Sequence, residues 1–358
     1  MTVQNTKKRL MALDIFRGLT MMAMIIVNSP DTFGELSHAY WIGVNFADLI
    51  FPFFILIVGV SISLGFRNVD KQNLAPVTQK ILKRTVIMFA IGMVVNLFYT
   101  HFEQIRVLGV LQRIALVYCA CCFLTIYCST RQLVKLGAAI LFTYWIFILI
   151  VPAPGLEAGQ LERGKNIINW FDQFMPGMLW RGDWDPEGLL STFPAIVTGI
   201  IGVLMGRIVM SKESLTHQVM QLFLLGFGLF CLGCIWSLAF PMIKQIWSST
   251  FVLVTGGLGA MSLAAIVWYT DMRSFRWGTY LPLVFGANAI SAYVIHVVIE
   301  KILDWKIGNQ SVHDSYVAAM SSAGFSEITS ITLWVIVFFA VCTVPVWWLY
   351  HKKIFIKI

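Results

Sequence analysis

The fold of this chain is decided by the stretch VNFADLIFPFFILIVGVSISLGF, residues 44–66. It contains one acidic residue, Asp48, and no basic residue. A helix of about 20 mostly apolar residues is long enough to cross the hydrocarbon core of a bilayer. The stretch is therefore predicted to be a transmembrane helix. Nine further apolar stretches of this kind lie at about 10–29, 84–100, 108–128, 134–152, 188–207, 218–240, 248–269, 279–300 and 328–350.

The composition of the whole chain agrees with this interpretation. Of its 358 residues, 58% are hydrophobic and 12% are charged, whereas soluble domains carry about 25% charged residues. A soluble fold could not keep that much apolar surface out of water. The 14% of aromatic residues also excludes a disordered chain. We predict an all-α, polytopic membrane protein with about ten transmembrane helices, one domain over residues 1–358 and a long outer loop at 153–187.

The distribution of basic residues predicts the orientation in the membrane. If both termini are cytoplasmic, 17 of the 26 Lys and Arg residues lie in inside segments, 7 in outside segments and two within spans. Cytoplasmic loops of membrane proteins carry an excess of Lys and Arg. The net charge of +8 therefore marks topology. It does not predict a nucleic-acid partner, because no inside segment is long enough to fold into a reading domain.

Ionisable residues inside the predicted spans are candidates for function, since each costs roughly 2.5–3.5 kcal/mol on insertion scales. Asp14 and Arg17 stand three residues apart on one helix face, and a local ion pair is the alternative to a functional role. Asp48 enters its span at a helix end, where backbone hydrogen bonds are the alternative. Arg113 needs a partner, and pairing with Asp14 or Asp48 is its structural alternative. His296 also needs a partner at membrane depth.

One further histidine, His38, lies in the first outer loop, followed by Ala39, Tyr40 and Trp41. An ordinary solvated side chain is the alternative for this residue. A histidine titrates near neutral pH and can serve as a proton donor or acceptor in catalysis. On the residues alone, the chain fits an enzyme or a transporter.

Several long blocks then resemble the heparan-α-glucosaminide N-acetyltransferase family. They run in one order from residue 9 to the last residue, as RLMALDIFRGLTMMAMIIVNSP at 9–30, HAYWIGVNFADLIFPFFILIVGVSI at 38–62, IRVLGVLQRIALVY at 105–118, WDPEGLLSTFPAIVTGIIGVLMGRI at 184–208, NAISAYVIHVVIE at 288–300 and LYHKKIFIKI at 349–358. The resemblance implies transfer of an acetyl group from cytosolic acetyl-CoA, across the membrane, to the amine of a glucosamine-type sugar. It also implies an integral membrane protein, here of a bacterial inner membrane.

The resemblance also implies which residues form the site. The family's active-site histidine matches His38, and an asparagine near the end of the first span matches Asn28. We expect His38 to act as general base, Asn28 to bind the thioester oxygen or orient His38, and Asp48 to orient the imidazole. Asn288 and His296 match family positions, and with Asp14 they are predicted to contact the acceptor.

Coenzyme A carries phosphates, so a cytoplasm-facing channel should hold cations that bind them. The predicted cofactor-binding residues are Arg17, Gln112, Arg113, Lys352 and Lys353. No spacing typical of a metal site occurs, so no metal is expected. Leu108 stands where the family has a proline, and the first outer loop is shorter than the family's. An acceptor simpler than heparan sulfate, such as a free amino sugar or a short glycan, is therefore expected.

Several alternatives remain open at this stage. A ping-pong route would acetylate His38 first, whereas a direct route would not. A membrane O-acyltransferase of envelope polysaccharide and a sugar transporter without chemistry are the rival functions, and a structural or assembly role is a third. The expected partners are acetyl-CoA, an amino sugar, the lipid bilayer and, as an open alternative, a second copy in a homodimer.

Overall fold

The computed structural model describes residues 10–29, 32, 34–67, 69, 72–100, 102–305 and 311–356. Some of the basic residues behind the charge bias lie outside these described residues, namely Lys7, Lys8, Arg9, Lys71, Lys306 and Lys357. Throughout the described residues the architecture is helical and without a β-sheet, as predicted.

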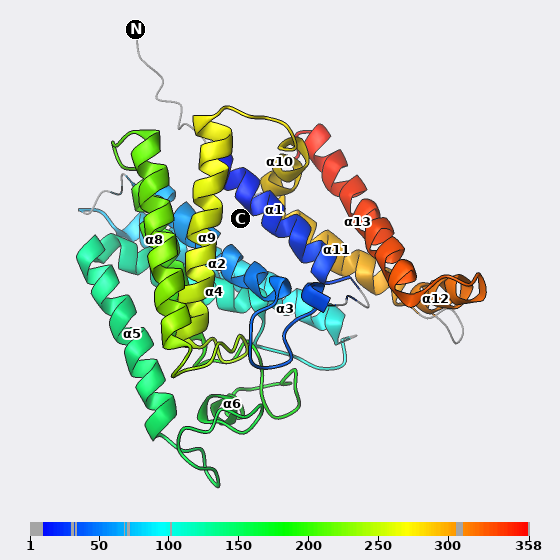
Figure 1. Cartoon of the computed structure of the whole chain (residues 1–358), viewed down its shortest axis with the longest axis horizontal. Coiled ribbons are helices and arrows are strands. Elements are labelled where there is room, and N and C mark those ends of the chain that lie inside the picture. Colours follow the sequence, from blue (N-terminus) through cyan, green and yellow to red (C-terminus); the bar gives the residue numbers. More distant parts are fainter. Residues whose placement is uncertain are drawn as a thin grey trace.

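Long helices follow one another from the first described residues to the last (Figure 1). In chain order they are α1 (Met11–Val27), α2 (Phe46–Gly65), α3 (Ala75–Tyr99), α4 (Val110–Tyr127), α5 (Thr130–Ile150), α7 (Thr192–Val209), α8 (Leu215–Trp236), α9 (Ser249–Val267), α10 (Tyr280–Ala287), α11 (Ala289–Leu303) and α13 (Glu327–His351). Shorter elements are η1 (Gly34–Leu36), α6 (Ile167–Asp172), the π-helical turn η2 (Trp268–Met272) and α12 (Val312–Ser322).

Eight helices among the described residues are long and apolar enough to cross a membrane. They are α2, α3, α4, α5, α7, α8, α9 with η2, and α13. The chain is therefore a polytopic membrane protein. Each of the ten predicted stretches coincides with a helix or a helix pair, but α1 has only 17 residues. The count of ten stays a prediction.

The predicted span at 279–300 is wrong as a single helix. The helix is interrupted at Asn288, where the axes of α10 and α11 meet at an angle of 88°. Apolar periodicity alone gives no sign of this bend, because both halves are apolar. The pair counts as one broken span or as a re-entrant segment, which is tolerated at membrane depth where protein surrounds it.

Close backbone contacts hold the central helices together. A methyl group added at Gly202 of α7 would lie 2.2 Å from the carbonyl oxygen of Leu56 in α2. One added at Gly18 of α1 would lie 1.7 Å from the carbonyl oxygen of Pro282 in α10. Small residues allow membrane helices to approach this closely. These contacts hold α7 against α2 and α1 against α10, and α2, α7 and α9 are the most deeply buried of the eight candidate spans.

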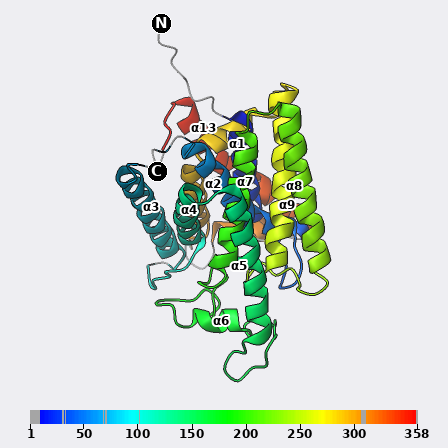
Figure 2. The ribbon, with the colours of Figure 1, turned by 90° about the vertical axis from the view of Figure 1, so that its left-hand side faces the viewer.

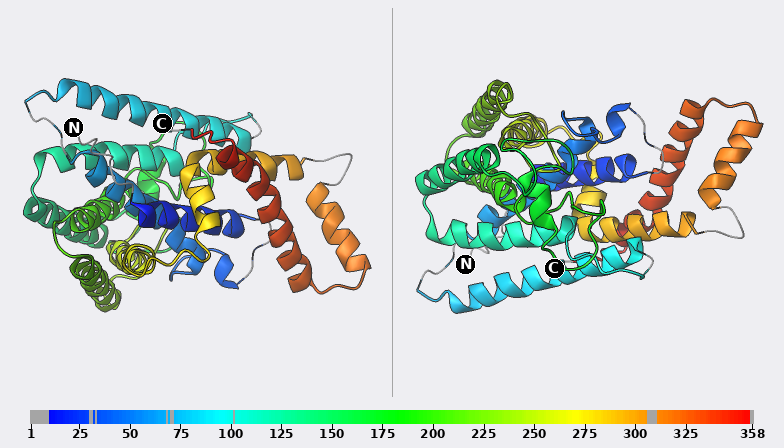
Figure 3. Two further views of the ribbon diagram at one scale, coloured as in Figure 1. Left: turned by 90° about the horizontal axis from the view of Figure 1, so that it is seen from above. Right: turned by 90° about the horizontal axis from the view of Figure 1, so that it is seen from below.

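The bundle has two distinct ends (Figures 1 and 2). The loops around α6, the α8–α9 connection and the segment between α1 and α2 gather at one end, and the start of α1 and the end of α13 lie toward the other. The placement of both termini on the cytoplasmic side stays a prediction. α12 and α13 form a hairpin that projects sideways from the bundle (Figure 3).

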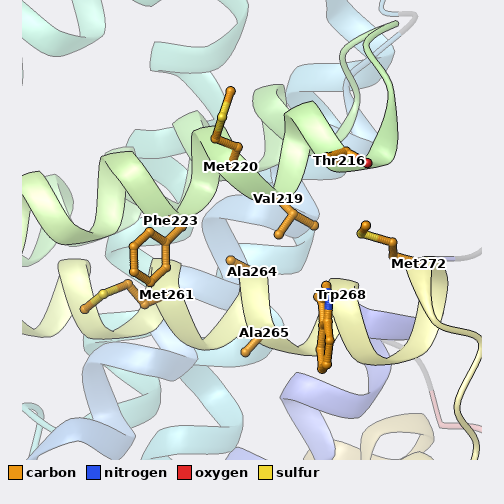
Figure 4. A pocket seen from close by; sticks show the side chains of 9 residues that line it. All are labelled: Thr216, Val219, Met220, Phe223, Met261, Ala264, Ala265, Trp268 and Met272. Carbon is orange, nitrogen blue, oxygen red and sulfur yellow. The ribbon is translucent and has the colours of Figure 1, made fainter.

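An apolar groove of about 480 Å³ lies between α8 and the α9–η2 helix (Figure 4). Its walls include Phe223, Met261 and Trp268. The groove is at the start of α8, whereas the histidine-bearing loop lies beyond the other end of that helix. It is therefore separate from the site described below.

Candidate active site

His38 forms a compact group with Asp48 and Lys244 at the end of the bundle that carries α6. The Nδ1 atom of His38 lies 2.9 Å from Oδ1 of Asp48. An ionised carboxylate only accepts hydrogen bonds, so Nδ1 carries the ring proton and Nε2 keeps a free lone pair. The His38 side chain is 48% exposed. A substrate can therefore reach Nε2 from outside.

Asp48 is fixed by the first turn of α2. Its Oδ2 accepts hydrogen bonds from the backbone N–H groups of Asn45 at 3.0 Å and Ala39 at 3.1 Å. The first turn of a helix also favours negative charge. These bonds allow the fully buried carboxylate to remain charged. Backbone bonding was the alternative to a role for Asp48, yet the same carboxylate makes the contact with His38 that an orienting role requires.

Lys244 is the member of the group that the sequence did not predict. Its Nζ lies 3.2 Å from Oδ1 of Asp48, and 3.0 and 3.4 Å from Nδ1 and Nε2 of His38. An atom on the lone-pair axis of one ring nitrogen would lie much farther from the other. The ammonium therefore sits beside the face of the imidazole and occupies neither lone pair. Burial lowers the pKa of Lys244 below its ordinary value, and the charge of Asp48 opposes that shift.

A tightly bonded turn holds Lys244 in place. The backbone N–H of Trp247 donates to the Lys244 carbonyl at 2.9 Å, and that of Ser248 donates to Ile243 at 3.0 Å. Trp247 is buried and has a left-handed φ of 52°. Such a conformation costs a bulky residue about 1–3 kcal/mol and persists only where the surroundings enforce it. The strained turn lies directly beside the group around His38.

The same turn is joined to the loop of His38. The N–H of Gly43 donates to the carbonyl of Met242 at 2.9 Å, and the side chain of Gln245 donates to the carbonyls of Ala39 and Tyr40, each at 3.4 Å. These bonds connect segments that are about 200 residues apart in the chain. They explain how the fold brings Lys244 to His38.

Arg113 lies behind this group and is fully buried in α4. Its NH2 donates to the carbonyl of Gly188 at 3.0 Å and to the hydroxyl of Ser191, and its guanidinium lies 5.0 Å from the Trp247 ring centre. The alternative in which Arg113 pairs with Asp14 or Asp48 is wrong. The outer loop supplies carbonyl oxygens instead. Nε and NH1 of Arg113 have no partner among the described residues.

The outer loop is fastened to the start of α4 by Arg106. This guanidinium donates to both carboxylate oxygens of Asp185, at 2.8 and 2.6 Å, and to Glu187. Burial raises the pKa of the nearby Asp172 to about 7, although the hydrogen bond that it accepts from the Asp185 backbone N–H lowers it. The ion pairs on Arg106 set the position of Gly188, whose carbonyl faces Arg113.

The other predicted catalytic residue, Asn28, caps the end of α1 and is exposed. Among the described residues its side chain makes no hydrogen bond to His38 or Asp48. The role predicted for Asn28 stays a prediction.

Asp14 and Arg17 form the local ion pair that the sequence offered as an alternative, at 3.0 Å. Arg17 also donates to Ser61 near the end of α2 and to the carbonyl of Gly286. Ser61 and Asp48 are 13 positions apart in α2, which corresponds to about 20 Å along the helix. Asp14, which is predicted to contact the acceptor, therefore lies far from His38.

The residues after α13 lie close to the break between α10 and α11. Asn288 accepts a hydrogen bond from the backbone N–H of Ile356 at 3.4 Å. Lys353 lines a cleft of about 480 Å³ whose other walls are Tyr280, Tyr350, His351 and Phe355. Arg17 contacts Gly286 two residues before Asn288. The structure thus brings three predicted residues, Arg17, Asn288 and Lys353, into one region away from His38.

The remaining predicted residues are placed as follows. His296 is fully buried in α11, with Nδ1 2.6 Å from the carbonyl oxygen of Tyr293 and Nε2 without a partner among the described residues. Gln112 is buried beside Gly109 at the start of α4. Lys352 is exposed at the end of α13. None of the three belongs to the group around His38.

Comparisons with known proteins agree with the resemblance seen in the sequence. The family described as heparan-alpha-glucosaminide N-acetyltransferase, catalytic, matches residues 9–246. The chain is 26% identical over 420 aligned residues to the heparan-alpha-glucosaminide N-acetyltransferase of Homo sapiens, covering 98% of this chain and 60% of the relative. It is 26% identical to that of Mus musculus, covering 100% and 62%. The chain thus spans about three fifths of these relatives.

Proposed function

The chain belongs to the heparan-α-glucosaminide N-acetyltransferase family, and from this premise we propose that it transfers an acetyl group from acetyl-CoA to the amine of a glucosamine-type sugar. The observation that carries the proposal is the group around His38. A half-exposed imidazole is oriented through Nδ1 by a buried carboxylate, and its Nε2, 3.4 Å from Nζ of Lys244, is directed away from that carboxylate. This is the arrangement a general base needs.

In this proposal His38 takes the proton that the amine loses as it attacks the thioester. Asp48 holds the imidazole with Nε2 directed away from the carboxylate, and it balances the charge that appears on the ring. Asn28 stands ten residues before His38 and contributes a second polar group at the acceptor side. The free amine of a sugar is the nucleophile, so the acceptor must reach the half-exposed side of His38.

The donor enters from the opposite end of the bundle. Lys353 and the aromatic walls of its cleft, with Arg17 nearby, offer cations for phosphates and rings for a base. We place the nucleotide part of coenzyme A there, with Lys352 and Asn288 beside it. The pantetheine arm then has to cover about 20 Å along α2 to bring the acetyl group to His38.

Arg113 and Gln112 are separated from that cleft. Arg113 lies about 6 Å from the ring centre of Phe51, one turn beyond Asp48. We therefore assign it to the acetyl end of the path, as support for Trp247 and the outer loop. His296 lines the interior of the bundle between the two ends.

The membrane placement completes the proposal. With ten spans and both termini in the cytoplasm, acetyl-CoA binds from the cytoplasm and His38 faces the outside of a bacterial inner membrane. The excess of Lys and Arg in the inside segments supports this orientation. The acceptor then never enters the cytoplasm.

The direct test is release of free thiol from acetyl-CoA by the purified chain, in detergent, on addition of glucosamine. We expect release with the wild type and a fall of about 10²-fold or more in His38→Ala, because a general base contributes about that much. His217→Ala is the matched control, since among the described residues the His217 side chain bonds to Gln221 on the same helix, α8. If His38→Ala released thiol as fast as the wild type, His38 would not be the general base. If the wild type released no thiol, the proposed function itself would be contradicted.

A second measurement separates the two routes of acetyl transfer. Wild type is mixed with radiolabelled acetyl-CoA without acceptor, quenched and separated from small molecules. Label retained on the chain and lost in His38→Ala indicates the ping-pong route. A chain that stays unlabelled although it turns over with glucosamine indicates direct transfer.

A further inference from the structure

The ion pair with Asp48 uses only part of the hydrogen-bonding capacity of the Lys244 ammonium. Its side chain is only 16% exposed. Burying an ammonium is costly unless its donors are used. An ammonium has three N–H donors, and one oxygen, Oδ1 of Asp48, accepts from it among the described residues. The remaining donors lie beside the imidazole, with Nζ 3.4 Å from Nε2.

The position relative to Nε2 gives these donors a use. The reacting amine must lie within hydrogen-bond distance of Nε2, and the acetyl carbonyl must lie against that amine. The oxygen of that carbonyl is therefore within reach of Nζ. Donors directed at the place where negative charge develops usually supply the largest part of catalysis in acyl transfer.

We propose that Lys244 is the oxyanion-binding residue of this site, donating to the carbonyl oxygen of the acetyl thioester during transfer. The inference rests on the proposed acetyl transfer and adds a residue to it. The resemblance matched Asn28 to a site residue, expected to bind the thioester oxygen or to orient His38, but its exposed side chain is not bonded to His38 or Asp48 among the described residues. Lys244 instead contacts both residues, and its turn is held rigid by the strained Trp247.

The step balances with these residues alone. The lone pair of the neutral amine forms the C–N bond, and the C=O electron pair moves to oxygen, where Lys244 binds the resulting negative charge. His38 Nε2 takes the proton from the amine. The C=O bond then re-forms, the C–S bond breaks, and the departing sulfur takes the proton from His38 to give the free thiol. Lys244 keeps its charge throughout, and His38 ends neutral.

The test compares variants of the full chain that are purified as monodisperse peaks. Lys244→Met is expected to lower kcat by about 10²–10³-fold, the cost of removing one oxyanion donor. The KM for acetyl-CoA should change by less than about threefold, because the interaction forms only as the transition state is reached. Lys165→Met is the matched control, since the Lys165 side chain is 62% exposed and pairs with Glu162. It should match the wild type.

A double-variant comparison separates this role from a structural ion pair. If Lys244 only neutralises Asp48, adding Lys244→Met to Asp48→Asn should cost nothing further. If it binds the oxyanion, the double variant should lose about another 10²-fold in kcat relative to Asp48→Asn alone. Should Lys244→Met fail to fold, Lys244→Gln, which keeps an N–H donor without the charge, is expected to retain an intermediate kcat.

The outcomes are distinguishable. An active wild type with an equally active Lys244→Met or Lys244→Gln overturns the assignment of Lys244 and leaves the proposed function intact. The same assignment is overturned if the double variant is no slower than Asp48→Asn. A wild type that releases no thiol with glucosamine contradicts the proposed function, and the role of Lys244 falls with it.

Discussion

The ion pairs by which Arg106 attaches the outer loop can be tested by measuring how easily that loop opens when Arg106 is replaced. Arg106→Met keeps the length and apolar part of the side chain and removes the guanidinium. Asp185, 1% exposed, then loses the two bonds of 2.8 and 2.6 Å that compensate its charge. Burial alone raises the pKa of Asp185, and Arg106 holds it below its ordinary value. Removing one partner of such a buried pair costs about 3–5 kcal/mol.

Most of that cost should appear as opening of the loop, because residues 153–187 lie outside the transmembrane helices α5 and α7 that they connect. A change of about 3 kcal/mol corresponds to a roughly hundredfold larger open population. Trypsin cuts after basic residues, and the loop carries the exposed Lys165 and Arg181. We expect Arg106→Met to be cleaved there about a hundredfold faster than the wild type under native conditions.

The double variant Arg106→Met/Asp185→Asn tests whether the cost comes from the buried Asp185 carboxylate that Arg106→Met leaves without its partner. It removes the buried carboxylate as well, so it should be cleaved more slowly than the single variant. Thiol release should fall in parallel with opening, since Gly188, directly after this loop, accepts a hydrogen bond from Arg113 behind the site. Wild-type cleavage rates in Arg106→Met, or equal rates in the single and double variants, would refute the reasoning.

Two further predictions concern stability. The pKa of Asp172 in the folded chain is about 7, above its ordinary value of 3.8, so the folded state holds the proton more tightly. The stability linked to this proton is present at low pH and is lost as pH rises from about 4 to 7. Unfolding titrations at several pH values should show a smaller decline in Asp172→Asn, and an unchanged decline would contradict the assignment. Gly202→Ala forces a methyl group against the carbonyl of Leu56 at 2.2 Å and should destabilise the chain by about 1–3 kcal/mol. Gly228→Ala, where the added methyl meets nothing within 4 Å, should not lower the melting temperature, and equal losses in the two variants would show that close packing is not the cause.

Much of the fold could be read from the chain because membrane insertion depends on local composition. The stretch at 44–66 is apolar enough to predict a span by itself, and α2 forms within it. The bend at Asn288 could not be predicted in this way. It separates two apolar segments of one hydrophobic run, and α10, on one side of it, packs closely against α1 at Gly18.

The candidate site was predicted in part. His38 and Asp48 are ten residues apart. The resemblance pointed to His38, and the rarity of a carboxylate at the entry of a span pointed to Asp48. Nothing in the sequence marked Lys244 as a site residue, because single lysines are common in loops between membrane spans. Its partner lies 206 positions away, and such a contact depends on how the loops pack. Arg113 was recognised as unusual, but its partners are carbonyl oxygens, which sequence patterns do not reveal.

By itself, the sequence determined that this is a helical membrane protein of a known family, with a histidine between its first two apolar stretches and few charges within them. These properties follow from local composition, from charge counts and from blocks in a fixed order. Only the tertiary structure decided which charges meet. It separated Arg17 and Lys353 from His38 by much of the length of α2 and brought Lys244 to the imidazole. The physical reason is that hydrophobic patterning specifies which segments are buried, whereas close packing and hydrogen bonds between loops specify which of them touch.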